Sequence, residues 1–400
     1  MIAISKNKLR TLRILCLMPF LLLITAPGQA QMTNPESQGD KKSSGPELSL
    51  YGEVGLEYTD NVYRLTEDQI STMEANDQED IISGRFKDMD SISDYIIKPQ
   101  LGIRLDSDSP LGGEFRLISW LRYNYYTKND GSGFLEGRIR LRNSMGENGT
   151  LTMEGNFISG FKKKNYLSGA DDINENGNIS GDERTYSSAT YDEYEGIIAY
   201  EHEIIKDKYK KISELDIRPF IEYLFRTYNS TFGNRDKDIA SGGVGLHLEF
   251  INKIDLEMVY QYESVSSPDN RELILFDETS SVIDVNGDGV IRRNAALVTN
   301  IDRSADRHTI EINPSLKLSK DALFYMGYRK RTSKYTSDNQ LDIEHYNQKA
   351  YRERIRSGIR YDFTKAWSAE AEYSRTKNED EEDGVYTENN FIFTIKYTFI

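Results

Sequence analysis

The 400-residue chain has little of several residue types that define common classes of protein. It contains one cysteine, four histidines and two tryptophans. A single cysteine forms no intramolecular disulfide and no thiolate metal cluster, so a disulfide-stapled secreted domain is excluded. The excess of 65 acidic over 50 basic side chains argues against a nucleic-acid-binding surface. The mean hydropathy of −0.63 argues against a bundle of membrane-spanning helices.

One long apolar run is present, and it lies near the N-terminus. Residues 14–25 are apolar or small, they follow four basic residues within the first 13 positions, and Gly28-Gln29-Ala30 comes shortly after them. This order is typical of a secretory signal, and the run is short for a bilayer span. We therefore expect residues 1–30 to be a signal peptide that is removed together with Cys16. The alternative is an uncleaved anchor.

Removal of the signal would change the charge of the chain. It would leave 46 basic and 65 acidic residues, a net charge of −19, and no cysteine. Residues 31–46 are rich in Ser, Gly, Lys, Gln and Asn. Because such a composition cannot bury a core, we expect a flexible periplasmic lead-in there. Residues 47–400 would then form a single folded unit.

From residue 47 onward, apolar and polar residues alternate in segments separated by turn residues. In the last segment Phe391, Phe393, Ile395, Tyr397 and Phe399 share one face, because the side chains of a strand alternate with a period of two. The same pattern predicts fourteen strands, at residues 48–58, 95–105, 114–126, 134–142, 150–159, 191–205, 215–226, 240–250, 255–264, 308–318, 322–332, 350–362, 367–377 and 390–400.

The links between these segments alternate in length. Links such as 143–149 and 251–254 are short, whereas 59–93, 160–190 and 265–307 are long. Short turns at one end and long loops at the other are typical of outer-membrane barrels, and 26 tyrosines suit aromatic girdles. The sequence therefore predicts an all-β, transmembrane antiparallel β-barrel of about 14 strands in the bacterial outer membrane, in contact with lipid and lipopolysaccharide. The alternative, a soluble β-sandwich or solenoid, would not need this many aromatic residues.

One face of the predicted strands is rich in ionised residues, and in a barrel this face would point inward. The lumen-lining residues predicted from this pattern are Arg116, Arg122, Arg138, Arg140, Arg142, Glu195, Arg218, Glu222, Arg352, Arg354, Arg356 and Arg360. They are consistent with a charged constriction that selects solutes, and equally with a mesh of salt bridges that fills the lumen. Trp120 falls on the same inward face, as a single aromatic rung.

Two loops resemble calcium-binding loops. Residues 172–183 place oxygen-bearing side chains and a glycine at the spacing of the twelve-residue calcium loop, and residues 284–289 repeat its first half, with Ala295 where the closing Glu is expected. The predicted ligands are Asp172, Asn174, Asn176, Asn178, Ser180, Glu183, Asp284, Asn286 and Asp288. Calcium would order an exposed loop. The alternative is a polar loop that binds no ion, and no other cofactor is expected.

The sequence gives little indication of catalysis. His202, His247, His308 and His345 show no spacing to a serine or aspartate that resembles the known barrel hydrolases. We therefore expect a protein that is not an enzyme.

The segment Tyr58-Thr-Asp60-Asn61-Val62-Tyr63-Arg64-Leu65 resembles the opening of the β-barrel porin 2 family and of related outer-membrane proteins associated with exopolysaccharide systems. The resemblance implies a passive channel or export barrel for a polar or charged solute, including polysaccharide, with polysaccharide export components as partners. The alternative is a structural or adhesive surface barrel with a closed lumen and calcium-stabilised loops. Although Phe399 lies one place before the usual C-terminal position, we expect the barrel assembly machinery to recognise the row Phe393, Tyr397 and Phe399.

Overall fold

The structure is a computed structural model. It describes residues 45–75, 84–109, 113–146, 148–170, 184–206, 212–250, 253–268, 270–275, 296–340, 342, 345–380 and 384–399. The predicted signal peptide, nearly all of the lead-in and both calcium motifs lie outside the described residues.

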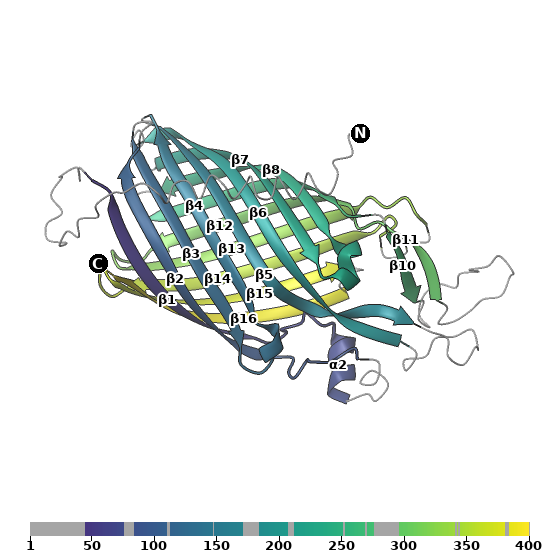
Figure 1. The fold of residues 1–400 in the computed structure, drawn as a ribbon. Helices are drawn as coiled ribbons and strands as arrows, with labels where there is room; N and C mark the ends of the chain where they lie inside the picture. Colours follow the sequence, from purple (N-terminus) through teal and green to yellow (C-terminus); the bar gives the residue numbers. More distant parts are fainter. Residues whose placement is uncertain are drawn as a thin grey trace.

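Fourteen antiparallel strands close into a barrel (Figure 1), which confirms the predicted fold class. The barrel strands are β1 (Glu47–Thr59), β2 (Asp94–Asp108), β3 (Glu114–Tyr126), β4 (Phe134–Met145), β5 (Gly149–Ala170), β6 (Arg184–Lys206), β7 (Ile212–Tyr228), β8 (Lys237–Phe250), β9 (Ile254–Ser266), β12 (Ala305–Lys317), β13 (Ala322–Tyr335), β14 (Lys349–Asp362), β15 (Trp367–Asp380) and β16 (Gly384–Phe399). The first and last strands pair from Leu50↔Phe399 to Thr59↔Asn390, so the sheet has no open edge.

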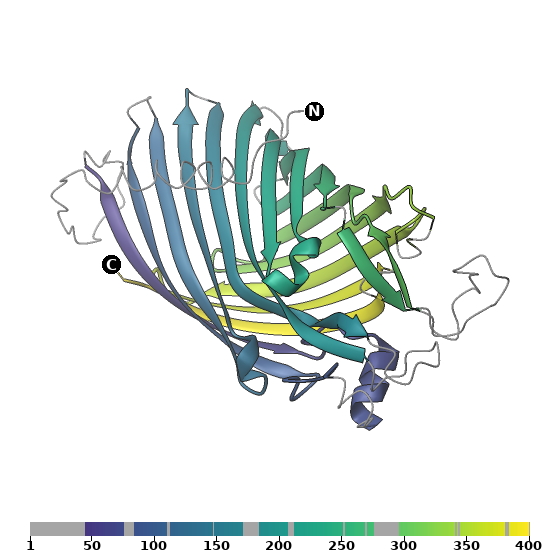
Figure 2. The same ribbon diagram turned by 45° about the vertical axis from the view of Figure 1, so that its right-hand side comes forward.

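The remaining described elements belong to the connections at one end of the barrel. Helix α2 (Glu67–Ala75) and the hairpin of β10 (Asn270–Leu275) and β11 (Ala296–Ile301) project from the end opposite the first residues of β1 and the last of β16 (Figure 2). Short 3-10 turns occupy Asp130–Ser132 and Ser230–Arg235. Short turns face the periplasm in outer-membrane barrels, and α2 and the hairpin lie at the other end. That end is therefore the outer one. Among the described residues, no helix is both long and apolar enough to cross a membrane.

Three loop predictions need correction. The predicted loop 160–190 is partly strand, because β5 and β6 continue to Ala170 and Arg184. Their pairing contains three register shifts, and Gly160, with φ of 76°, lies within the first of them; these bulges break the period of two in the sequence. The predicted loop 265–307 contains the β10–β11 hairpin. The predicted loop 59–93 contains α2, whose first turn has reciprocal hydrogen bonds between Thr66 and Gln69.

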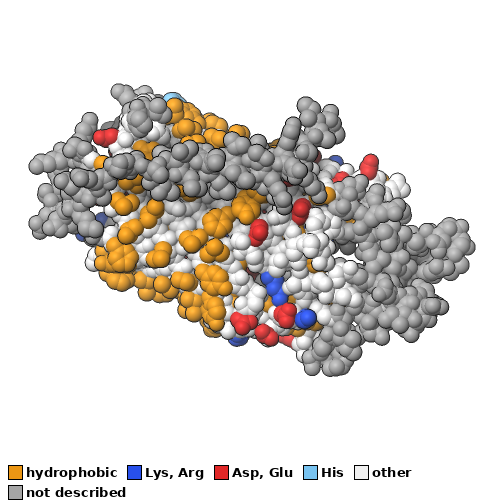
Figure 3. Space-filling view, in the orientation of Figure 1, with side chains coloured by type: hydrophobic (Ala, Val, Ile, Leu, Met, Phe, Trp, Pro, Cys, Tyr) orange, Lys and Arg blue, Asp and Glu red, His pale blue; other side chains and the backbone are white. Residues whose placement is uncertain are grey.

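The outer wall of the barrel is covered by exposed apolar side chains. Leu101, Ile221 and Phe391 expose 72%, 62% and 56% of their surface, and aromatic and aliphatic residues of the same parity continue around the strands. Figure 3 shows these side chains over the strands, with charged ones gathered nearer the end that carries α2. Such a surface is stable only against lipid, which excludes the soluble β-sandwich.

Candidate functional site: the charged interior

Positions that alternate with the outer apolar residues carry charged and polar side chains into the barrel. On the β3–β5 wall, Arg138 Nη2 and Arg140 Nε both donate to Glu154 Oε2, at 2.5 and 2.6 Å. Arg122 reaches both Glu53 (3.2 Å) and Glu136 (3.4 Å). Arg122 also lies 5.1 Å from the Trp120 ring, Arg116 lies 2.5 Å from Asp106, and Arg142 lies 3.2 Å from Glu201. The positive charge of this wall is therefore balanced by carboxylates one or two strands away.

The other walls repeat this local pairing. Arg354 lies 3.5 Å from Glu372, and Arg356 reaches Glu311 at 3.8 Å. The remaining predicted residues have polar partners too: Arg218 with Glu257 (2.8 Å), Arg360 with Asp362 (3.0 Å), Glu222 with Gln261 (3.1 Å) and Glu195 with Asn156. Eleven of the twelve predicted residues thus have polar partners, on the same strand for Arg360 and on nearby strands for the others. Their part in forming a conducting lumen remains a prediction.

The segment that follows β1 folds across the outer mouth. Asn61 Nδ2 donates to the carbonyls of Leu65 (2.8 Å) and Thr387 (3.2 Å), and Asn61 Oδ1 accepts from Leu65 N–H (2.8 Å). The Tyr63 hydroxyl is hydrogen-bonded to Ser132 Oγ at 3.0 Å, and burial raises the pKa of Tyr63 to about 12, so that it stays protonated. These contacts hold Arg64, whose φ is 56°, between the walls.

Arg64 belongs to a group of charges that spans the barrel. Arg64 Nε lies 3.3 Å from Glu388 Oε2 on β16, and the guanidinium is within electrostatic range of Tyr191 on β6 and Arg352 on β14. The shorter path between β6 and β14 around the closed sheet takes six steps, so these two strands lie on nearly opposite walls. The mouth cluster, as we call it, consists of Arg64, Arg226, Arg307, Arg331, Arg352, Glu193, Glu263 and Glu388.

The mouth cluster has more positive than negative members. Five guanidinium groups face three carboxylates; Arg226 pairs with Glu193 at 2.5 Å, and Glu263 accepts from Arg331 at 3.4 Å. For Arg352, no carboxylate lies within salt-bridge distance among the described residues. The mouth cluster itself therefore has two more positive than negative groups, although the whole chain is acidic.

Aromatic rings line one wall beside the mouth cluster. Tyr126, Phe134, Phe161, Tyr191 and Tyr228 come from the five consecutive strands β3 to β7, and we call them the aromatic ladder. Successive ring centroids are 6.4, 4.9, 5.0 and 5.3 Å apart, within the range of favourable ring contacts. The Arg226 guanidinium lies 4.4 Å from the Tyr191 centroid, so the mouth cluster and the ladder are in contact.

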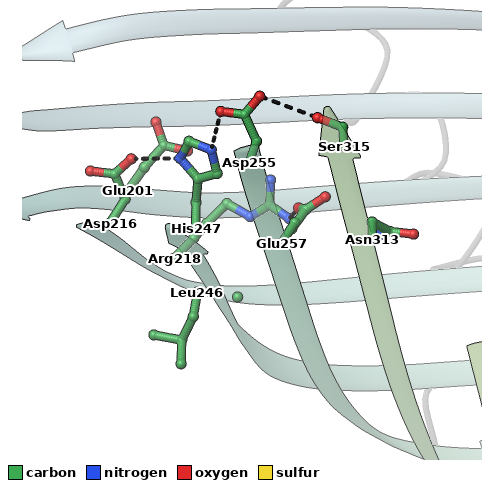
Figure 4. A pocket seen from close by; sticks show the side chains of 10 residues that line it. Glu201, Asp216, Arg218, Leu246, His247, Asp255, Glu257, Asn313 and Ser315 are labelled. Atoms are coloured by element: carbon green, nitrogen blue, oxygen red, sulfur yellow. Dashed lines mark hydrogen bonds and ion pairs between the residues drawn. The ribbon is translucent and has the colours of Figure 1, made fainter. Parts of the chain in front are cut away.

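At the short-turn end the interior contains a cavity of about 480 Å³. Its wall includes Asp216, His247, Asp255 and Ser315, which lie on four strands and point toward one another in Figure 4. His247 Nδ1 lies 3.2 Å from Asp216 Oδ2, and His247 Nε2 lies 3.9 Å from Asp255 Oδ1. Ser315 Oγ donates to Asp255 Oδ2 at 3.2 Å.

Sequence reasoning missed most of the mouth cluster, the ladder and this cavity. Tyr126 lies four residues after Arg122, and Tyr191 lies two residues before Glu193. Because residues an even number apart in a strand share a face, this spacing alone would have placed both rings inside. Arg64 could not be found in this way, because it lies in a connection and not in a strand.

A closed antiparallel barrel with an apolar outer wall and a charged interior defines an outer-membrane β-barrel protein of bacteria. No protein-family model and no curated protein matches the chain. The solved structures it resembles include the outer membrane channel DcaP of Acinetobacter baumannii, with 11% identity, a TM-score of 0.41, and coverage of 90% of this chain and 99% of that one. The Pseudomonas putida toluene transporter TodX has 10% identity, a TM-score of 0.40, and coverage of 88% and 89%. An anion-selective porin from Comamonas acidovorans has 11% identity, a TM-score of 0.35, and coverage of 88% and 100%.

Proposed function

We propose that the protein is a porin-like channel for the passive passage or export of polar or charged solutes, and not an enzyme. The observation that carries the proposal is the mouth cluster, in which Arg64 stands between opposite walls with a surplus of guanidinium groups. A purely structural barrel has no evident need for basic charge there, whereas a channel uses it to select solutes.

The Arg64→Ala variant should change ion selectivity in a planar bilayer. A unit charge about 5 Å from a passing ion in water contributes about 0.8 kcal/mol, or roughly a four-fold change in relative permeability. We expect the wild type to prefer anions. The variant, which leaves Glu388 without this partner, should lose roughly that factor and conduct more current per channel.

The matched control for this experiment is Lys365→Ala. Lys365 is exposed in the turn after β14 at the opposite end, so its removal subtracts one positive charge away from the mouth. Equal shifts in the two variants would contradict a selective mouth. A correctly folded barrel that passes no current would reject the channel and favour the alternative, a structural or adhesive barrel with a closed lumen.

For the solute, we propose a carbohydrate that carries carboxylates. Flat aromatic faces bind the apolar faces of sugar rings, and the aromatic ladder places five aromatic rings next to the basic mouth cluster. A polysaccharide would fit this description, and export components would then be its partners.

A short oligosaccharide of uronic acids should interrupt the channel current at lower concentration than a neutral glucose oligosaccharide of the same length. Tyr191→Ala should weaken this block at least five-fold, because stacking on one ring is worth about 1 kcal/mol. Tyr194→Ala is the control, since Tyr194 lies three residues further along β6 but on the outer wall, with 38% of its surface exposed. If both oligosaccharides block equally, or if Tyr194→Ala has the same effect, the carbohydrate assignment is wrong.

Two further proposals concern the loops with the calcium motifs and the last strand of the barrel. Calcium would order the loops at 172–183 and 284–288, which lie outside the described residues. The barrel assembly machinery would recognise the outward row Phe393, Tyr397 and Phe399 on β16.

A further inference from the structure

Three potential metal ligands converge at the short-turn end of the barrel, away from the mouth cluster. Glu214 and Asp216 lie on β7 and share a face, because they are two residues apart in a strand. His247 on β8 is the register partner of Asp216. One ligand atom from each of the three side chains lies within 4.8 Å of the others, and His247 Nδ1 is 3.2 Å from Asp216 Oδ2.

A fourth residue orients the histidine. Asp255 on β9 lies on the other side of the imidazole ring, with Oδ1 3.9 Å from His247 Nε2 (Figure 4). The Ser315 hydroxyl holds the second oxygen of Asp255 at 3.2 Å. With a cation between Glu214 and Asp216, the Nδ1 lone pair would face that cation, and Asp255 would favour the tautomer with its proton on Nε2, which is the usual arrangement behind a metal-binding histidine. Without a cation, Asp216 Oδ2 at 3.2 Å would be the acceptor for a proton on Nδ1.

The charge balance of the cavity leaves room for a cation. Three neighbouring carboxylates have basic partners: Glu201 with Arg142 (3.2 Å), Glu257 with Arg218 (2.8 Å) and Glu249 with Lys317 (3.0 Å). Glu214 and Asp216 have no Lys or Arg ion pair among the residues whose side chains the structure describes, and the Asp216 side chain is only 7% exposed. Asp216 is buried and Glu214 is partly exposed beside it, and a divalent ion between the two carboxylates would neutralise both.

We propose that Glu214, Asp216 and His247 bind a divalent transition-metal ion, with Zn²⁺ as the best match to the donor set. An imidazole with two carboxylates suits zinc, and the cavity beside them admits water as a fourth ligand. Calcium is a poor match, because it requires six to eight oxygen ligands. The assignment does not depend on conduction through the barrel.

The test is direct metal binding to the refolded full-length barrel in detergent. After incubation with Zn²⁺ or Co²⁺ and desalting, we expect one ion per wild-type chain, with Co²⁺ giving visible absorption of a nitrogen- and oxygen-ligated site. His247→Gln and Asp216→Asn should each weaken binding more than 100-fold. Asp255→Asn, which alters only the residue behind the ligand, should weaken binding by 10- to 100-fold.

The control is His308→Gln. His308 lies on β12 and contacts Tyr260 at 2.9 Å, so this variant removes a histidine that the site does not use. Heat-modifiable migration in gels confirms that each variant is folded. The proposal is overturned if the wild type retains no more Zn²⁺ than His247→Gln, if His308→Gln loses the ion equally, or if an equal concentration of Ca²⁺ displaces it.

A second readout separates this site from the channel proposal. Micromolar Zn²⁺ added on the short-turn side should shift the selectivity of a conducting wild-type barrel toward anions, because the ion cancels the negative charge of Glu214 and Asp216. The shift should be absent in His247→Gln, and its presence there would contradict the assignment. If the barrel does not conduct, the binding measurement still decides for or against the metal site.

Discussion

Replacing Leu101 with arginine is expected to destabilise the folded barrel in a bilayer by about 2–4 kcal/mol, the cost of a basic side chain at the midplane of the lipid-facing wall. Leu101 is the central residue of β2, exposes 72% of its surface and has Gly52 and Leu121 as its register partners. In this position an arginine would be too far from either interface to reach water without thinning the bilayer. Denaturant-induced unfolding in vesicles of defined lipid measures the loss.

The matched control is the same substitution at Leu48. Leu48 is also outward-facing, with 53% of its surface exposed, but it is the second residue of β1, next to the short-turn end. There the arginine reaches the headgroups, and the expected cost falls to about 0–1 kcal/mol. If both substitutions cost the same amount, the apolar residues do not form a belt with a midplane at Leu101, and the position of the barrel in the membrane would have to be revised.

The strand pattern could be predicted from the sequence because lipid imposes a simple rule on a barrel wall. Every second residue faces lipid, so Phe391, Phe393 and Ile395 show the period of two without interruption. The pattern failed where the structure leaves the membrane. Beyond Gly160 the register of β5 shifts against β6, and a strand that is not constrained by lipid need not alternate.

The interior could be predicted only as a set of inward residues. Parity places Arg138 and Glu154 inside, but it cannot say that they pair, because the pairing depends on the register between β4 and β5. The mouth cluster needs more information still. Arg64 is positioned by the hydrogen bonds of Asn61, one of which joins residues 326 positions apart in the chain.

Asp94→Ala should be the most damaging single substitution of an interior or loop residue that we propose. The Asp94 side chain is fully buried at the start of β2 and accepts hydrogen bonds from the N–H groups of Thr127, Lys128 and Asn129 at 2.8–3.2 Å. It also accepts from the Thr127 hydroxyl (2.8 Å) and the Asn129 amide (2.9 Å). Each buried N–H left without a partner costs about 1–3 kcal/mol, so we expect a loss of about 3 kcal/mol, reduced because the β3–β4 turn can open to water.

Because Asn129 Oδ1 in turn accepts from the N–H groups of Asp90 and Ser91, the loss of Asp94 should loosen the connection that carries Arg64. In Asp94→Ala, amide hydrogen exchange at residues 127–129 should therefore accelerate, and noise in the channel current should increase. Asp94→Asn keeps one oxygen acceptor and should have an intermediate effect on both.

Asp108→Ala at the exposed end of the same strand is the control, and we expect it to change neither quantity. Fast exchange at the turn with an unchanged current would mean that the Asn61 hydrogen bonds hold Arg64 without help from Asp94. Unchanged exchange would mean that the carboxylate does not fix the turn at all.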